Sequence, residues 1–190
     1  MSVRPAVDAP VTWAVVATAT GVFLAQAALA ARAGVPPHVP VAALFVERPV
    51  LAWAVAPLLH HGVRHLAANV LALAVAAPVE RRVGTRWTLA LLAVAGYLPL
   101  FAEGLKLAAL AGDPHVGAYG ASAFAFGLLG SGLVLDKERD PRWWLVVLTG
   151  VAAALVVSFD VVMGLDAPLT VNVGHLGGLL AGAGIGALAD

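Results

Sequence analysis

Apolar stretches long enough to cross a membrane recur along most of this chain, and they constrain its fold more than any other feature. Of the 190 residues, 61% are hydrophobic and 12% are charged, and the mean hydropathy is +0.93. Soluble domains carry about 25% charged residues. A spanning helix needs roughly 20 apolar residues, so about six spans would fill most of the length and leave no room for a soluble domain. The sequence therefore predicts an all-α membrane protein with a single domain over residues 1–190.

Six apolar segments are the expected transmembrane helices. They cover residues 11–31, 63–79, 87–101, 121–135, 143–163 and 172–188. Pro99 predicts a kink or stop near the end of the third span, and residues 102–119 are expected to form a loop with a short helix. Residues 33–49 contain four prolines and cannot form one continuous helix. Because that segment is nevertheless apolar, we expect a first loop embedded in the membrane.

The basic residues give an expected orientation. If the N-terminus is cytoplasmic, seven of the eleven lysines and arginines lie inside. These seven are Arg4, Arg81, Arg82, Arg86, Lys137, Arg139 and Arg142. The excess of positive charge on one side favours this orientation. The second, fourth and sixth spans then all begin on the outer side of the membrane.

Polar residues gather at one depth, near the outer ends of those three spans. His65, Ser122 and His175 each lie in or near the first turn of one of them. A hydroxyl or an imidazole is costly in hydrocarbon unless it is partnered, so such residues indicate function. If the helix starts lie together, Ser122 and His175 form a nucleophile and a general base. His65 and Asn69 share a helical face and can donate to an oxyanion together with the backbone N–H of Ser122.

Glycines give two of the spans a face of small residues. Gly178, Gly182 and Gly186 recur at four-residue spacing in the sixth span, and Gly127 and Gly130 lie in the fourth. Such faces let membrane helices approach closely. A close approach of the fourth and sixth spans is what a hydrogen bond between a serine and a histidine on those spans requires.

Other kinds of site have little support in the sequence. The absence of cysteine excludes disulfides and thiolate metal ligands. His61 and His65 have the spacing of a metal or haem pair, but no carboxylate at ligand spacing supports them, so neither a metal nor a cofactor is expected. The net charge of zero and the lack of a basic run argue against nucleic acid. Asp160 and Asp166 are the only candidates for a third catalytic residue, and nothing ties them to His175.

The order and spacing of these residues resemble the rhomboid family of intramembrane serine proteases. The resemblance extends over residues 33–182. Its motifs are His65-xxx-Asn69, Gly120-x-Ser122 and His175-xx-Gly178-xxx-Gly182, with His60 as the family's additional histidine and Glu80-xxx-Gly84 as its turn motif. Any one of these motifs is weak, but five of them in the right order on the right spans are a specific signal.

The resemblance implies a six-helix rhomboid-like bundle that hydrolyses peptide bonds of single-span membrane proteins near the outer side of the bilayer. In that family Ser122 would be the nucleophile and His175 the general base. His65, Asn69 and His60 would assist the oxyanion. The partners implied are single-span membrane proteins and the lipid bilayer, and the expected location is the plasma membrane of a prokaryote.

Two positions depart from the family's pattern. Ala123 stands where a glycine usually follows the serine, and the aromatic–basic pair of the first loop has no clear counterpart among Glu47, Arg48 and Trp53. Neither departure removes a catalytic atom. The alternative is an inactive rhomboid-like protein that binds membrane clients, although such a protein would normally lack the serine or the histidine. A transporter would need a continuous polar path or an inverted repeat, and neither is evident.

Overall fold

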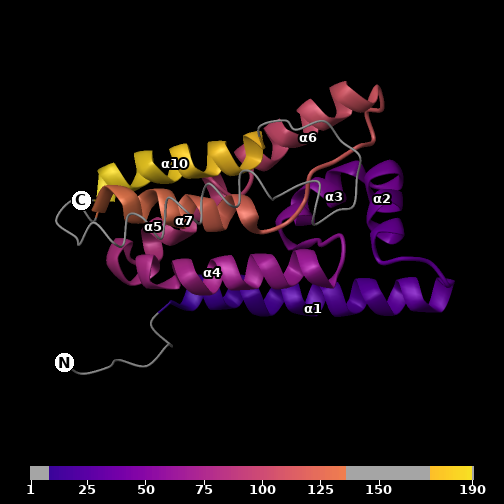
Figure 1. Cartoon of the computed structure of the whole chain (residues 1–190), viewed down its shortest axis with the longest axis horizontal. Helices are drawn as coiled ribbons and strands as arrows, with labels where there is room; N and C mark the ends of the chain where they lie inside the picture. Colours follow the sequence, from indigo (N-terminus) through magenta and orange to yellow (C-terminus); the bar gives the residue numbers. More distant parts are fainter. Residues whose placement is uncertain (1–8, 136–171, 190) are drawn as a thin grey trace.

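The structure is a computed structural model that describes residues 9–135 and 172–189, and its regular elements within these ranges are all helical (Figure 1). In chain order they are α1 (Pro10–Ala33), α2 (His38–Glu47), α3 (Pro49–Val55), the short 3₁₀ helix η2 (Ala56–Leu58), α4 (Val63–Val83), α5 (Thr85–Val94), α6 (Leu98–Ala111), α7 (Ser122–Leu135) and α10 (Val173–Ala189).

Three stretches of helix are long and apolar enough to cross a membrane. They are Pro10–Ala33, Val63–Val83 and Thr85–Ala111, the last combining α5 and α6. The helices α2, α7 and α10 and the stretch Pro49–Leu58 are also apolar but shorter. This composition identifies an integral membrane protein, as the hydropathy predicts. The expected fifth span, residues 143–163, lies outside the described residues together with Asp160 and Asp166, so the count of six spans stays a prediction.

The third expected span and the segment after it form an interrupted stretch of helix. The chain breaks its helix after Val94 and starts again at Leu98, and α6 then continues to Ala111. The expected kink near Pro99 is present, and Pro99 itself lies in the first turn of α6, where its missing N–H costs no helical hydrogen bond. Residues 102–119, expected to form a loop with a short helix, hold the rest of α6 up to Ala111 and then the link to α7, so Glu103 and Lys106 are helical residues.

The first loop is broken where its prolines predict. One short helix, α2, ends at Glu47, and Pro49 opens the next, α3. These two helices and η2 lie together at one end of the bundle, beside α1 (Figure 1). The first loop is therefore a compact helical cap, and it is packed against α1 and against the beginning of α7.

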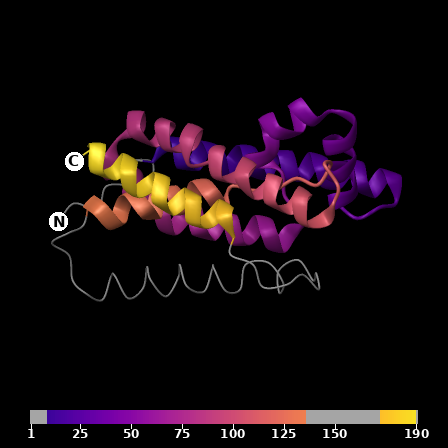
Figure 2. The ribbon, with the colours of Figure 1, turned by 90° about the horizontal axis from the view of Figure 1, so that it is seen from above.

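The helix α7 occupies the middle of the bundle. It packs against α4 on one side and α10 on the other, and both views show α10 running alongside it (Figure 2). Nine of its fourteen residues are buried. A helix that is apolar on every face suits such an interior position. The residue that begins α7, Ser122, is therefore held by neighbours on several sides.

The glycine faces of α7 and α10 meet. A Cβ atom at Gly182 would overlap the carbonyl of Gly127, and one at Gly178 would overlap the carbonyl of Ala123. In addition, the hydroxyl of Ser131 donates to the carbonyl of Gly182 at 2.7 Å. The two backbones are therefore nearly in contact, as small residues at this spacing allow.

Glu80 ties the end of α4 to the beginning of α1. Its carboxylate is buried and accepts hydrogen bonds from the N–H groups of Val11 at 2.9 Å and Thr12 at 2.8 Å, and from the Thr12 hydroxyl at 2.6 Å. A carboxylate at a helix N-terminus satisfies free N–H groups and interacts favourably with the helix dipole. Glu80 thus caps α1 from the end of α4, and Gly84, with φ of 82°, makes the turn that follows α4.

Candidate active site

A glycine turn leads into Ser122 at the start of α7. Gly120 has φ of 124°, a region that side chains rarely adopt. Its N–H donates to the carbonyl of Ala56 in η2 at 2.9 Å. The segment before Ser122 is thus fastened to the end of the first loop, and this contact fixes where α7 begins.

His65 and Asn69 of α4 face this turn. A Cβ atom at Gly120 would lie 2.8 Å from Cε1 and Nε2 of His65 and 3.0 Å from Nδ2 of Asn69. Only a glycine leaves room for both side chains against the backbone. The structure therefore brings His65 and Asn69 to the residue two positions before Ser122.

His175 lies in the first turn of α10. Its backbone N–H donates to Oδ1 of Asn172 at 2.9 Å. Its ring stacks on the ring of Phe126, with centroids 4.5 Å apart and an angle of 13° between the planes. Because Phe126 is one helical turn after Ser122, this stack places the imidazole beside the Ser122 face of α7. Among the described residues, no hydrogen bond joins Ser122 to His175; catalytic hydrogen bonds often tighten only when substrate binds.

Three buried polar side-chain atoms have no hydrogen-bond partner within the described part of the chain. They are Nε2 of His60, Nδ2 of Asn69 and Nδ1 of His175. Buried polar atoms are nearly always paired in proteins, and exceptions are concentrated at functional positions. All three belong to residues that the sequence singled out. Asn69 lies against the turn at Gly120, His60 lies beside His65, and His175 stacks on Phe126, one turn after Ser122.

His60 is held in the link between η2 and α4. Its Nδ1 is 3.0 Å from the carbonyl of Leu58, and its ring lies 5.1 Å from that of His65. The side-chain amide of Gln26 in α1 donates to the carbonyls of both His60 and Pro37. Burial lowers the pKa of His60 to about 4, so this imidazole is neutral at physiological pH.

The remaining histidines do not form a metal site. His38 and His61 stack with their centroids 4.5 Å apart, and the His61 N–H donates to Nδ1 of His65 at 3.3 Å. His38 begins α2, while His115 is exposed beside Asp113. Across the described residues, no three histidines or carboxylates converge in a way that would hold a metal ion.

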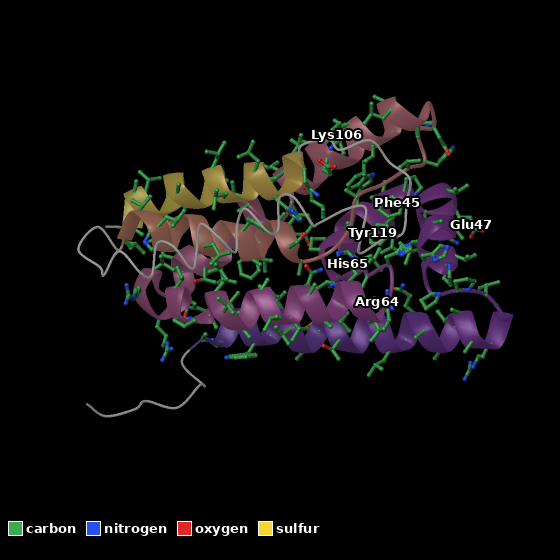
Figure 3. The ribbon with its side chains drawn as sticks, viewed as in Figure 1. Phe45, Glu47, Arg64, His65, Lys106 and Tyr119 are labelled. Atoms are coloured by element: carbon green, nitrogen blue, oxygen red, sulfur yellow. The ribbon has the colours of Figure 1, made fainter. Side chains whose placement is uncertain are left out.

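Aromatic contacts anchor the first loop beside the site. Trp53 meets the edges of Phe45 and Phe101, at centroid distances of 5.3 and 5.0 Å, and Gly104 leaves the room that its indole needs. Phe45 in turn approaches Tyr119, at 6.0 Å, on the segment that leads to Gly120. Figure 3 shows Phe45, Tyr119 and His65 following one another from α2 toward α4. Aromatic packing thus anchors the loop without the expected aromatic–basic pair.

The sequence did not reveal two polar residues that hold the start of α10. Asn172 caps that helix, and Glu103 of α6 accepts hydrogen bonds from the N–H groups of Val173 and Gly174. Asn172 carries a recognisable signal, because asparagine directly before an apolar helix is a common N-cap. Glu103 carries none, since it lies 70 residues before Val173 in the sequence.

A comparison with protein families bears on these positions. The Rhomboid domain matches residues 48–189, which is well over half of the chain. The protein belongs to the rhomboid family. The matched range holds every candidate site residue from His60 to His175, whereas α1 lies before it. A comparison with curated proteins gives no match for this rhomboid.

Proposed function

We propose that this rhomboid is an intramembrane serine endopeptidase that cleaves single-span membrane proteins through a Ser122–His175 dyad. The observation that carries the proposal is the contact of His65 and Asn69 with the glycine turn that leads into Ser122, together with the polar atoms of His60, Asn69 and His175 that have no hydrogen-bond partner among the described residues. Such atoms can bind a peptide carbonyl or a water molecule, whereas a purely structural core would have paired them. Membership of the rhomboid family supports the same chemistry.

In the proposed reaction, Oγ of Ser122 attacks the scissile carbonyl carbon while its proton passes to His175. The oxyanion accepts hydrogen bonds from the backbone N–H of Ser122, from Nδ2 of Asn69 and from His65, which His60 supports. The C–N bond then breaks, and His175 returns the proton to the leaving amine. A water molecule next gives a proton to His175, attacks the acyl carbon and releases the new carboxyl end as Oγ regains its proton.

The proposed setting is a six-span bundle in the plasma membrane of a prokaryote, with the N-terminus in the cytoplasm. The outer ends of the second, fourth and sixth spans then carry the site. A substrate helix must unwind locally, because an intact helix uses its own backbone groups for hydrogen bonds. Polar side chains near Gly120 can form hydrogen bonds with the scissile peptide in place of those that the unwound helix loses.

The decisive experiment combines covalent labelling with cleavage. The wild-type protein in liposomes should react with a fluorophosphonate at Ser122 and should cut a single-span reporter. Ser122→Ala and His175→Ala should each abolish both reactions without affecting membrane insertion. The double variant should be no worse than either single one, because the two residues act as a unit.

The alternative is a rhomboid that binds membrane clients without cutting them. It predicts that the wild-type protein captures single-span clients, that Ser122 resists the fluorophosphonate and that Ser122→Ala changes nothing. Labelling of Ser122 with loss of cleavage in Ser122→Ala would exclude it.

A further inference from the structure

In the first turn of α10, the backbone N–H groups of Val173, Gly174 and His175 all donate to side-chain oxygens. Glu103 Oε2 accepts from Val173 at 2.7 Å and from Gly174 at 3.3 Å, and Asn172 Oδ1 accepts from His175 at 2.9 Å. Helix starts normally leave these groups to solvent or to a local cap. Here the acceptor for the first two comes from α6, so the first turn of α10 is fastened to another helix.

Lys106 sets the orientation of the Glu103 carboxylate. Its Nζ lies 2.6 Å from Oε1, which leaves Oε2 to face the helix start. Glu103 is only 3% exposed, so neither oxygen is well solvated, and a buried polar group is costly unless it is hydrogen-bonded. The two residues therefore form one fixed unit on α6.

The packing around this unit leaves the turn little freedom. A Cβ atom at Gly174 would lie 3.1 Å from Oδ1 of Asn172 and 3.4 Å from Cβ of Glu103, and one at Gly177 would lie 2.8 Å from Cβ of Pro99. The backbone of α10 thus rests directly on α6 at the height of His175. A shift of the carboxylate would move or release the turn that carries the imidazole.

We propose that Glu103 is a positioning residue for catalysis, which holds the first turn of α10 so that His175 meets Ser122. This inference rests on the proposed protease function. The carboxylate does not touch the reacting atoms; it sets the height and rotation of the helix end that carries the base. A displacement of about 1 Å in a catalytic group can cost on the order of 10²-fold in rate.

Glu80 provides a matched control at the other end of the bundle. It is also a buried carboxylate, 1% exposed, that accepts hydrogen bonds from two N–H groups at the start of another helix. The helix that it caps, α1, carries none of the candidate catalytic residues. Removing either carboxylate should destabilise the protein, but only removal of Glu103 should slow the chemistry of the folded molecules.

The experiment compares Glu103→Met, Glu103→Gln and Glu80→Met in liposomes. Kinetics are measured on a single-span reporter, together with the rate of Ser122 phosphonylation, both per folded molecule. We expect Glu103→Met to lower kcat and phosphonylation about tenfold or more with KM changed less than about threefold. Glu103→Gln keeps an acceptor oxygen and should stay within about threefold of wild type. Glu80→Met should lower the thermal midpoint and leave the rate per folded molecule unchanged.

Equal rates per folded molecule in Glu103→Met and Glu80→Met would overturn the positioning role. If Glu103→Met does not fold, Glu103→Asp decides the question, because it keeps the charge but withdraws the oxygen from α10. A full phosphonylation rate in folded Glu103→Asp would likewise overturn the inference. A wild-type protein that the fluorophosphonate does not label would instead contradict the proposed function itself.

Discussion

The imidazole of His175 lies flat against the phenyl ring of Phe126, with centroids 4.5 Å apart and planes 13° apart. Offset stacking of this kind orients both rings as well as burying them. Since Phe126 is one turn after Ser122 on α7, the stack links the side chain of the proposed base to the helix of the proposed nucleophile. The relative placement of the two catalytic groups therefore depends on an aromatic residue that takes no part in the chemistry.

The first prediction follows from this stack. Phe126→Leu should lower kcat about tenfold, because the imidazole loses the surface that fixes its plane. The matched control is Phe124→Leu, since Phe124 is fully buried in the same helix but lies in the core formed with α1, α4 and α5. Both variants should lose similar stability, on the order of 1 kcal/mol. Equal activity of the two variants per folded molecule would contradict the role of the stack.

The second prediction concerns the turn at Gly120. Gly120→Ala should abolish cleavage, because the new methyl group would meet His65 and Asn69 at 2.8 to 3.0 Å in a backbone conformation that alanine rarely adopts. Gly34→Ala is the control for the conformation alone, since Gly34 has φ of 67° and nothing within 4 Å of a new Cβ atom. It should cost about 1 to 2 kcal/mol of stability and keep its activity.

Cleavage rates and thermal midpoints of the two alanine variants separate these effects. If Gly120→Ala cuts the reporter as fast as Gly34→Ala does, then the function of His65 and Asn69 does not depend on the space that the glycine leaves for them.

The structure places His65 and Asn69, two of the residues that the sequence singled out, at this turn, but the sequence did not predict how they contact it. Histidine, serine and asparagine are costly in hydrocarbon, so their recurrence at one depth predicted a common place. The contact of Gly120 with α4 depends on a positive φ and on the hydrogen bond to Ala56, both of which arise from tertiary packing. Because the chain contains 20 glycines, the presence of a glycine at position 120 does not by itself predict a positive φ there.

The third prediction tests the oxyanion donors. Asn69→Ala should lower kcat on the order of 10²-fold with little change in KM, because Nδ2 has no partner until the oxyanion forms. His65→Ala should have a similar effect. His115→Ala, in the exposed link before α7, is the control and should be near neutral. An equal loss of substrate binding and of turnover in Asn69→Ala, seen as a rise in KM as large as the fall in kcat, would indicate a packing role for that amide.

His38 would not serve as a neutral control for this experiment. It begins α2 and stacks on His61, which donates its backbone N–H to Nδ1 of His65. Its replacement would therefore act indirectly on a site residue.

The boundary of α6 illustrates what local sequence could not predict. Glu103, Lys106 and a nearby proline indicated a loop with a short helix after the third span, and Pro99 indicated a kink or a stop near the end of that span. In the structure the proline opens α6, and the carboxylate is buried because the N–H groups of α10 and the Lys106 ammonium compensate its charge. Those partners are about 70 residues away or on the next turn, and only the folded bundle brings them together.

The last prediction concerns Ala123, the residue that replaces the family's usual glycine. Its side chain is 1% exposed and belongs to a core cluster with Ala56, Leu59 and Leu100, while its carbonyl lies under Gly178. The methyl group is therefore packed into the protein. Because its surroundings accommodate it, we expect it not to obstruct the substrate.

Ala123→Gly should accordingly lose stability and gain no activity. Glycine costs up to about 1 kcal/mol in a helix interior, and the lost methyl contributes about 0.8 kcal/mol of burial. Ala125→Gly is the matched control, since Ala125 is fully buried in the same helix and packs in the core with α1, α4 and α5. The measurements are the thermal midpoint in detergent and cleavage of reporters that differ only in the residue before the scissile bond. Both variants should lower the midpoint by a similar amount and cut the reporter series with the wild-type preference. A large gain in activity toward bulky residues in Ala123→Gly, at unchanged stability, would show that the methyl group restricts the oxyanion site after all.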